Sequence, residues 1–147
     1  GYKTDLLLDS LDAHLFGPAL DKVFILIGTN DIGKEIPQSE TLENLEGVIQ
    51  KISREYPLAQ IQLLSVLPVN EGEEYKGTVY LRTNEKIQDL NRAYQGLASI
   101  YTNVHFIDLY ETLLDETGQL GQEFTTDGLH LTIAGYAALS KALQETL

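Results

Sequence analysis

Two short segments of the sequence carry side chains whose types and spacing could support acid–base chemistry and the stabilisation of negative charge. In the first, Asp127 and His130 lie three residues apart, with Gly128 between them. A histidine that acts as a general base needs a carboxylate on its second ring nitrogen, which fixes the tautomer and stabilises the imidazolium. The spacing lets the two side chains fold toward each other. A capping aspartate beside a surface histidine is the structural alternative for the same residues.

The second segment, Gly28–Asp31, directly follows the apolar run Val23–Ile27. Glycine at the end of a strand allows close approach of the backbone, and the amide of Asn30 could donate a hydrogen bond to an oxyanion there. A simple turn accounts for the same residues, since Gly, Asn and Asp dominate turns. Taken alone, neither segment decides between catalysis and local structure.

Strand-like and helix-like segments alternate along the chain and must position these side chains. Short apolar runs predict strands over Val23–Ile27, Ile61–Leu67 and Val104–Leu109. Apolar spacings of three and four predict helices over 3–16, over 42–52 with Ser39 as cap, over 87–98, and after the cap Thr132. Polar loops are expected over 28–37 and 71–74.

This alternation is typical of βαβ units, and it predicts an α/β fold with a parallel sheet and helices on both faces. The uninterrupted apolar run Val23–Ile27 is typical of a strand that is covered on both faces. Because ligands bind at the carboxyl ends of parallel strands, we expect the functional residues in the loops after the strands and in the segment 125–130.

Composition narrows the class of protein. A length of 147 residues predicts one domain over 1–147. Lys and Arg number 10 against 22 Asp and Glu, and they form no basic stripe, so a nucleic-acid partner is not expected. No apolar run approaches the ~20 residues that span a bilayer. The absence of cysteine and of a visible signal favours a cytoplasmic location, and the three histidines, in separate elements, predict no metal site.

Together the two segments resemble conserved blocks of the SGNH (GDSL-type) hydrolases. Gly28-x-Asn30-Asp31 is similar to the third block, Asp127-x-x-His130 to the fifth, and Gly1–Thr4 looks like the second. The segments 65–70 and 84–91 resemble the branch that contains platelet-activating-factor acetylhydrolase-like proteins. The resemblance covers the whole chain. It implies a three-layer α/β/α, flavodoxin-like fold and hydrolysis of a small acyl or acetyl ester without a cofactor.

The resemblance also assigns roles to individual residues. His130 would be the general base that activates a serine, and Asp127 would orient it. Asn30, through its side-chain amide, and Gly1, through its backbone, would stabilise the tetrahedral oxyanion, where each donor contributes ~3–4 kcal/mol. Roles in substrate binding are expected for Asn70, Thr29 and Asp31.

The first block of the family, which supplies the nucleophilic serine, is not found in the sequence. Leu7–Leu11, which contains Ser10, resembles it, but Leu8 replaces the glycine, the segment is predicted to be helical, and it follows the second block instead of preceding it. Ser65 falls inside a predicted buried strand, where a packed hydroxyl is expected. Because the chain also begins with Gly1 and contains no methionine, we expect a fragment that lacks the N-terminal strands and the nucleophile and is inactive alone. The strand Val23–Ile27 would then have an open hydrophobic edge, available to the missing segment or to a second copy.

Two other functions stay open at this point. Gly28–Lys34 follows a strand and nearly fits a phosphate-binding loop, G-x-x-x-x-G-K-[ST]. Glu35 stands where a hydroxyl would bind magnesium, and Pro37 delays the helix whose N-terminus would hold the phosphate. A nucleotide binder is therefore one alternative. A non-catalytic module that binds a small molecule is the other.

Overall fold

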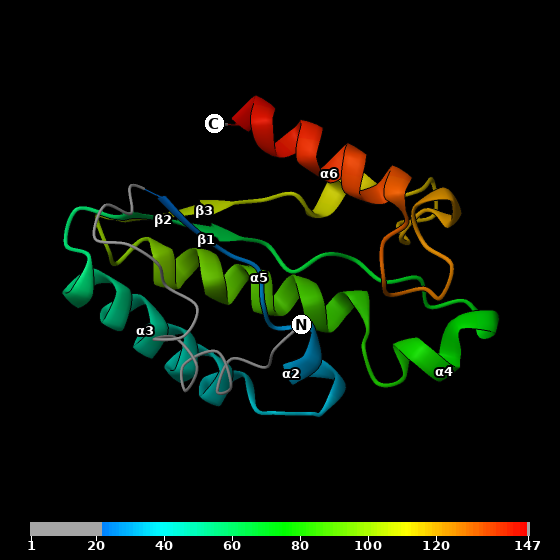
Figure 1. The fold of residues 1–147 in the computed structure, drawn as a ribbon. Helices are drawn as coiled ribbons and strands as arrows, with labels where there is room; N and C mark the ends of the chain where they lie inside the picture. Colours follow the sequence, from blue (N-terminus) through cyan, green and yellow to red (C-terminus); the bar gives the residue numbers. More distant parts are fainter. Residues whose placement is uncertain (1–21, 147) are drawn as a thin grey trace.

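A three-stranded parallel sheet lies at the centre of the computed structural model, which describes residues 22–146 (Figure 1). The strands are β1 (Lys22–Ile25), β2 (Gln60–Leu64) and β3 (Val104–Ile107), paired side by side in that order. The predicted parallel sheet is therefore confirmed, although each strand ends earlier than its apolar run. The predicted helix over 3–16 lies outside the described residues.

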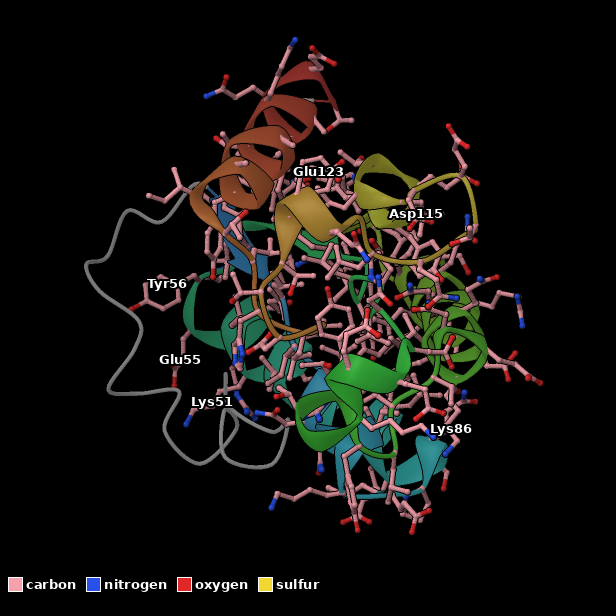
Figure 2. The ribbon with its side chains drawn as sticks, turned by 90° about the vertical axis from the view of Figure 1, so that its right-hand side faces the viewer. Lys51, Glu55, Tyr56, Lys86, Asp115 and Glu123 are labelled. Carbon is pink, nitrogen blue, oxygen red and sulfur yellow. The ribbon has the colours of Figure 1, made fainter. Side chains whose placement is uncertain are left out.

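Helices cover both faces of this sheet, as predicted. The longer helices α3 (Gln38–Glu55) and α5 (Asn84–Ala98) lie on one face, and α6 (Ile133–Thr146) lies on the other (Figure 1). The view in Figure 2 shows the same separation and places the charged side chains of Lys86, Asp115 and Glu123 on the outside. The described chain thus has the layered α/β arrangement that the alternating pattern predicts.

The core forms where the apolar stripes of the helices meet the sheet. On one face, Leu45 and Ile49 of α3 and Ile87 of α5 are fully buried in one cluster with Ile61 and other residues of the strands. On the other face, Leu139 of α6 belongs to a smaller cluster with Leu64, Ile107 and Leu109. Spacings of three and four residues place these side chains on the face of each helix that packs on the sheet.

Helix starts follow local capping chemistry, with one error in the prediction. Thr132 accepts a hydrogen bond from the N–H of Gly135 at 3.2 Å, which confirms it as the cap of α6. The prediction that Ser39 caps the second helix is wrong, because α3 begins at Gln38 and Pro37 occupies the capping position. Proline suits a helix start, since it fixes φ and has no N–H that would need a partner.

Short helices replace much of the two segments expected as loops. Helix α2 (Thr29–Gly33) follows β1 almost directly, and a 3₁₀ turn over Glu73–Tyr75 leads into α4 (Lys76–Val79). These helices are one turn long, so no apolar periodicity could reveal them. Buried Asp31 stabilises α2 against its neighbour by accepting a hydrogen bond from the hydroxyl of Thr41 at 2.9 Å.

The prediction that Val23–Ile27 is covered on both faces is wrong for the described structure. Phe24 and Leu26 are 46% and 48% exposed, and Val23 is only partly buried. Within residues 22–146, β1 pairs with β2 alone and lies at the edge of the sheet. This position agrees with the expected open hydrophobic edge.

The turn between β1 and α2 predicts a contrast between two glycine substitutions. Gly28 has a φ of +126°, and a Cβ there would lie 2.6 Å from the hydroxyl of Tyr94. We expect Gly28→Ala to lower the free energy of unfolding by roughly 2–4 kcal/mol, through backbone strain and overpacking. Gly96→Ala, inside α5 with open space around it, should raise it by roughly 0.4–1 kcal/mol. Urea unfolding of both variants measures the contrast, and a loss of equal size in both would contradict it.

Candidate active site

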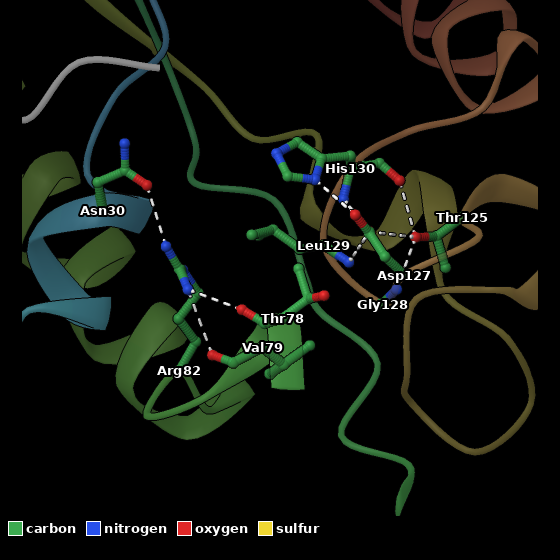
Figure 3. A network of polar contacts seen from close by, with 9 residues as sticks. All are labelled: Asn30, Thr78, Val79, Arg82, Thr125, Asp127, Gly128, Leu129 and His130. Atoms are coloured by element: carbon green, nitrogen blue, oxygen red, sulfur yellow. Dashed lines mark hydrogen bonds and ion pairs between the residues drawn. The ribbon is translucent and has the colours of Figure 1, made fainter. Parts of the chain in front are cut away.

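The predicted pairing of Asp127 with His130 is present in the loop before α6. Oδ2 of Asp127 lies 2.6 Å from Nδ1 of His130, and Oδ1 accepts the backbone N–H groups of Leu129 at 2.9 Å and His130 at 2.7 Å (Figure 3). An ionised carboxylate can only accept, so Nδ1 must carry the proton in this bond. The bond therefore leaves Nε2 of His130 as the ring nitrogen available to act as a base.

The electrostatics of this loop favour an ionised aspartate. Partial burial opposes the charged form, but hydrogen bonds from the His130 ring and from the N–H groups of His130 and Leu129 outweigh it. They lower the pKa of Asp127 to about 2. Asp127 therefore remains a carboxylate at neutral pH and can stabilise a positive charge on His130.

Thr125 fixes the shape of the same loop from inside. Its side chain is buried, and its hydroxyl donates to the carbonyl of His130 at 2.7 Å and accepts the N–H of Gly128 at 2.9 Å. Gly128 has a φ of +84°, and a Cβ there would lie 2.5 Å from Cβ of Tyr75. Only glycine therefore fits at position 128, where the loop packs against the segment that leads into α4.

Asn30 lies in α2, just beyond the end of β1, and its amide is hydrogen-bonded to Arg82. Oδ1 of Asn30 accepts a hydrogen bond from Nη2 of Arg82 at 3.0 Å. Figure 3 shows the amide nitrogen pointing away from the guanidinium. The donor end of Asn30 is therefore the end that Arg82 does not occupy.

Asn30 and His130 line one cavity of about 260 Å³, which also takes in Thr29 and Tyr136. Most of its remaining wall is apolar and is formed by Leu26, Val66, Leu67, Leu129, Leu131 and Leu139. An apolar cavity with a few polar groups is typical of sites that bind small molecules. The structure thus brings together the predicted base His130, the predicted amide donor Asn30 and one of the predicted binding residues, Thr29.

The other predicted binding residues lie elsewhere. Asp31 is 1% exposed and bonds Thr41, and Asn70 is 7% exposed. The amide of Asn70 donates to the carbonyl of Leu120 at 2.8 Å and accepts the N–H of Gly72 at 3.0 Å. Neither residue lines the cavity, so their positions lend no support to a role in binding substrate. Gly1 and Ser10 lie outside the described residues.

No serine lines this cavity within residues 22–146, where its hydroxyl groups are those of Thr29 and Tyr136. Ser65 is fully buried directly after β2, and its hydroxyl accepts the N–H of Leu109 at 2.9 Å. This contact agrees with the expected packed hydroxyl, although the residue falls just outside the strand.

The sequence analysis assigned no role to three residues that hydrogen-bond segments around the cavity. They are Asn84 and Asn91 of α5, and Arg82, which precedes this helix. Asn91 exchanges two hydrogen bonds with the backbone of Val66, and Asn84 does the same with Val69. Their spacing of two helical turns was a readable signal, because it places both on one face of a helix. Arg82 precedes the helix and offered no such signal.

In the segment that nearly fits a phosphate-binding loop, several backbone N–H groups already donate hydrogen bonds to carbonyls of the same segment. The N–H groups of Ile32, Lys34, Glu35 and Ile36 donate to carbonyls of Gly28, Asn30, Ile32 and Asp31. Phosphate-binding loops need such N–H groups to point at the ligand. This arrangement argues against the nucleotide-binding alternative.

Neither a cluster of metal-binding side chains nor a membrane-spanning helix is found in the described part of the chain. Among residues 22–146, no group of three or more His, Asp or Glu side chains could hold a metal ion. None of the helices in this range has both the length and the apolar character needed to cross a membrane.

Solved structures of other proteins share the fold of this chain. A structure from Streptococcus pneumonia, whose name contains the words platelet activating factor, is 61% identical with a TM-score of 0.97, over 99% of this chain and 68% of that one. A GDSL-like lipase from Bacteroides thetaiotaomicron shares the fold at 22% identity and a TM-score of 0.79, over 99% and 70% of the two chains. The family model of the GDSL-like lipase/acylhydrolases matches residues 1–138.

Curated relatives match over a part of their length. N-acylneuraminate cytidylyltransferase of Escherichia coli is 35% identical over 124 residues, which are 84% of this chain and 27% of the relative. Platelet-activating factor acetylhydrolase IB subunit alpha1 of Pongo abelii is 25% identical over 125 residues, 85% of this chain and 50% of the relative. The chain thus spans half or less of the length of these relatives.

The lowered pKa of Asp127 predicts how the Asp127–His130 pair contributes to stability. The folded pKa of about 2 lies below the ordinary value of 3.8, so the unfolded chain binds more protons between these values. The stabilisation should be complete above pH 3.8 and be lost as the pH falls toward 2. At this exposure it should amount to about 0.2–1 kcal/mol.

Urea unfolding of the wild type and of Asp127→Asn across this pH range tests the expectation. The difference in unfolding free energy should shrink between pH 4 and pH 2. Asp89→Asn is the matched control, because Asp89 pairs with Arg92 on the exposed face of α5. A difference for Asp127→Asn that stays constant down to pH 2 would show that the pair does not lower the pKa.

Proposed function

We propose that this chain, which belongs to the GDSL-like lipase/acylhydrolase family, supplies the general base and one oxyanion donor of an ester-hydrolysing site. The observation that carries the proposal is the shared cavity of Asn30 and His130, with Asp127 held against the far nitrogen of the imidazole. A base and an oxyanion donor that face one apolar cavity are the two elements that acyl transfer needs besides a nucleophile.

The geometry supports the following reaction. Nε2 of His130 removes the proton of a serine hydroxyl, whose oxygen attacks the ester carbonyl and forms a tetrahedral oxyanion. The amide of Asn30 donates a hydrogen bond to that oxyanion, and Asp127 stabilises the imidazolium. His130 then gives its proton to the departing alcohol. Water, deprotonated by His130 in the same way, then attacks the acyl-serine, and His130 returns the proton to the serine oxygen as the acid is released.

The serine would come from outside the described residues, because no serine within 22–146 lines the cavity. A segment that carries it would reach the cavity beside β1, where Phe24 and Leu26 are about half exposed. Further chain of this protein, or a second copy of it, could pack against that edge. We propose a small acyl or acetyl ester as substrate, because the cavity walls are apolar and its volume is modest.

Substitution of the base tests the catalytic assignment in the protein at its full natural length. His130→Gln should lower kcat for p-nitrophenyl acetate by roughly 10⁴-fold or more, and Asn30→Ala by roughly 10²–10³-fold. His105→Gln is the matched control, because His105 pairs with Gln60 on the exposed surface of the sheet. If the wild type binds the ester but does not hydrolyse it, the chain is a binding module. Equal activity of His130→Gln and the wild type would exclude His130 as the base.

Labelling with a fluorophosphonate tests the source of the nucleophile. We expect the intact mass of the 147-residue chain to stay unchanged after treatment. The protein at its full natural length should gain the mass of one adduct. No adduct should form when this protein is denatured before the probe is added. An adduct on a serine within 22–146 would overturn the proposed source of the nucleophile. An adduct on Ser10 would identify a nucleophile that we exclude on sequence grounds.

A further inference from the structure

We propose that Arg82 is the positioning residue that aims the amide of Asn30 at the oxyanion. The proposal rests on the proposed hydrolytic function. The side-chain amide of Asn30 could turn either its oxygen or its nitrogen toward the cavity, and Arg82 would hold it in the one orientation that suits an oxyanion donor. Arg82 precedes α5 and is 52 residues from Asn30 in the sequence.

The guanidinium of Arg82 forms a bridge between α2 and α4. Nε donates to the carbonyl and hydroxyl oxygens of Thr29 at 3.0 and 3.1 Å, and Nη2 donates to Oδ1 of Asn30 at 3.0 Å. Nη1 donates to the carbonyls of Thr78 and Val79 at 3.2 and 3.3 Å (Figure 3). Every one of these acceptors is a neutral oxygen. Within residues 22–146, Arg82 forms no ion pair that would compete for the guanidinium.

The chemistry of the two groups allows only one orientation of the amide. An asparagine amide has an acceptor oxygen and a donor nitrogen, and a half-turn about its last bond exchanges them. Arginine carries donors alone, so Arg82 can bond only Oδ1 and would repel a turned Nδ2. With Oδ1 held, Nδ2 points away from Arg82. A cation on the oxygen also polarises the amide and strengthens Nδ2–H as a donor.

The guanidinium is enclosed as well as bonded. A Cβ on Gly33 would lie 2.7 Å from Cζ of Arg82, so the guanidinium packs directly over this glycine. Burial lowers the pKa of Arg82 from its ordinary value, which indicates a partly desolvated cation. A charge–dipole interaction is stronger in such surroundings than in water.

The same bridge relates Asn30 to the base. The carbonyl of Val79 accepts from Arg82, and the side chain of Val79 lies 2.9 Å from where a Cβ on Gly128 would be. Tyr75, at the start of α4, packs against Gly128 even more closely. The loop that carries His130 therefore packs against α4 and the turn before it, and Arg82 is the side chain that connects α4 to Asn30.

Arg82→Lys tests this role, because it keeps the positive charge but removes the guanidinium group, whose several N–H donors reach Thr29, Asn30 and Val79 at the same time. In the protein at its full natural length, kcat for p-nitrophenyl acetate should fall roughly tenfold or more, but by no more than the loss in Asn30→Ala, with KM within twofold of the wild type. Arg92→Lys, at an exposed position of α5, is the matched control and should retain wild-type kcat.

A double-mutant cycle separates positioning from a general structural role. If Arg82 acts through Asn30, the double variant Asn30→Ala/Arg82→Lys should have the kcat of Asn30→Ala alone. The proposal would be overturned if Arg82→Lys lowered kcat by the same factor in the Asn30→Ala variant as it does in the wild type. Gly33→Ala, which displaces the guanidinium without removing a polar group, should lower kcat in the same direction and also have no effect once Asn30 is alanine.

Nuclear magnetic resonance of the side-chain amides tests the proposal independently of activity. In Arg82→Lys the Nδ2 resonances of Asn30 should move toward those of a solvent-exposed amide, while those of Asn103, bonded to Ser53, stay in place. Unchanged Asn30 resonances would overturn the proposal. If the wild type has no esterase activity but the Asn30 resonances move as expected in Arg82→Lys, the proposed function is rejected, while the hydrogen bond between Arg82 and Asn30 is confirmed.

Discussion

Where the chain leaves a sheet at the end of a strand, its backbone N–H and C=O groups need new hydrogen-bond partners. In this protein a single helix supplies several of them. Asn84 and Asn91 of α5 each exchange two hydrogen bonds with the backbone after β2, at 2.7 to 2.9 Å. Tyr94 of the same helix donates to the carbonyl of Ile27, just after β1, at 3.0 Å. A buried backbone group without a partner costs about 1–3 kcal/mol. Helix α5 therefore determines where two of the strands can end.

The positions of the proposed catalytic residues depend on those two strand ends. The backbone N–H of Asn70, next to the segment that Asn84 holds, donates to the carbonyl of Gly128 at 2.9 Å, within the loop of Asp127 and His130. Asn30 follows Ile27 by three residues, across the tight turn at Gly28 whose conformation excludes other residues beside Tyr94. The proposed base and the proposed amide donor thus come from segments far apart in the sequence, but both segments are held by hydrogen bonds to residues of one helix. Such a scaffold is what a geometrically demanding site needs.

How much of this could be predicted from the sequence follows from the range of each interaction. The pairing of Asp127 with His130 spans three residues, and the stripe of α5 repeats within one element, so local patterns were sufficient for both. Arg82 meets Asn30 across 52 residues, and Asn70 meets Leu120 across 50. The amino-acid type of Asn70 fits a binding role and an internal tether equally well. Only the folded chain separates these two uses.

The described residues of the proposed site are organised by contacts among themselves. Asp127 accepts its hydrogen bonds from residues two and three positions away, and Thr125 closes the loop from within. Asn30 is oriented by Arg82, which takes its other contacts from α2 and α4. None of these interactions uses a group that would belong to a serine or a substrate. In the proposed reaction, the dipoles that would stabilise charge in the transition state are therefore fixed during folding, so no reorganisation of them would be needed when an ester reacts.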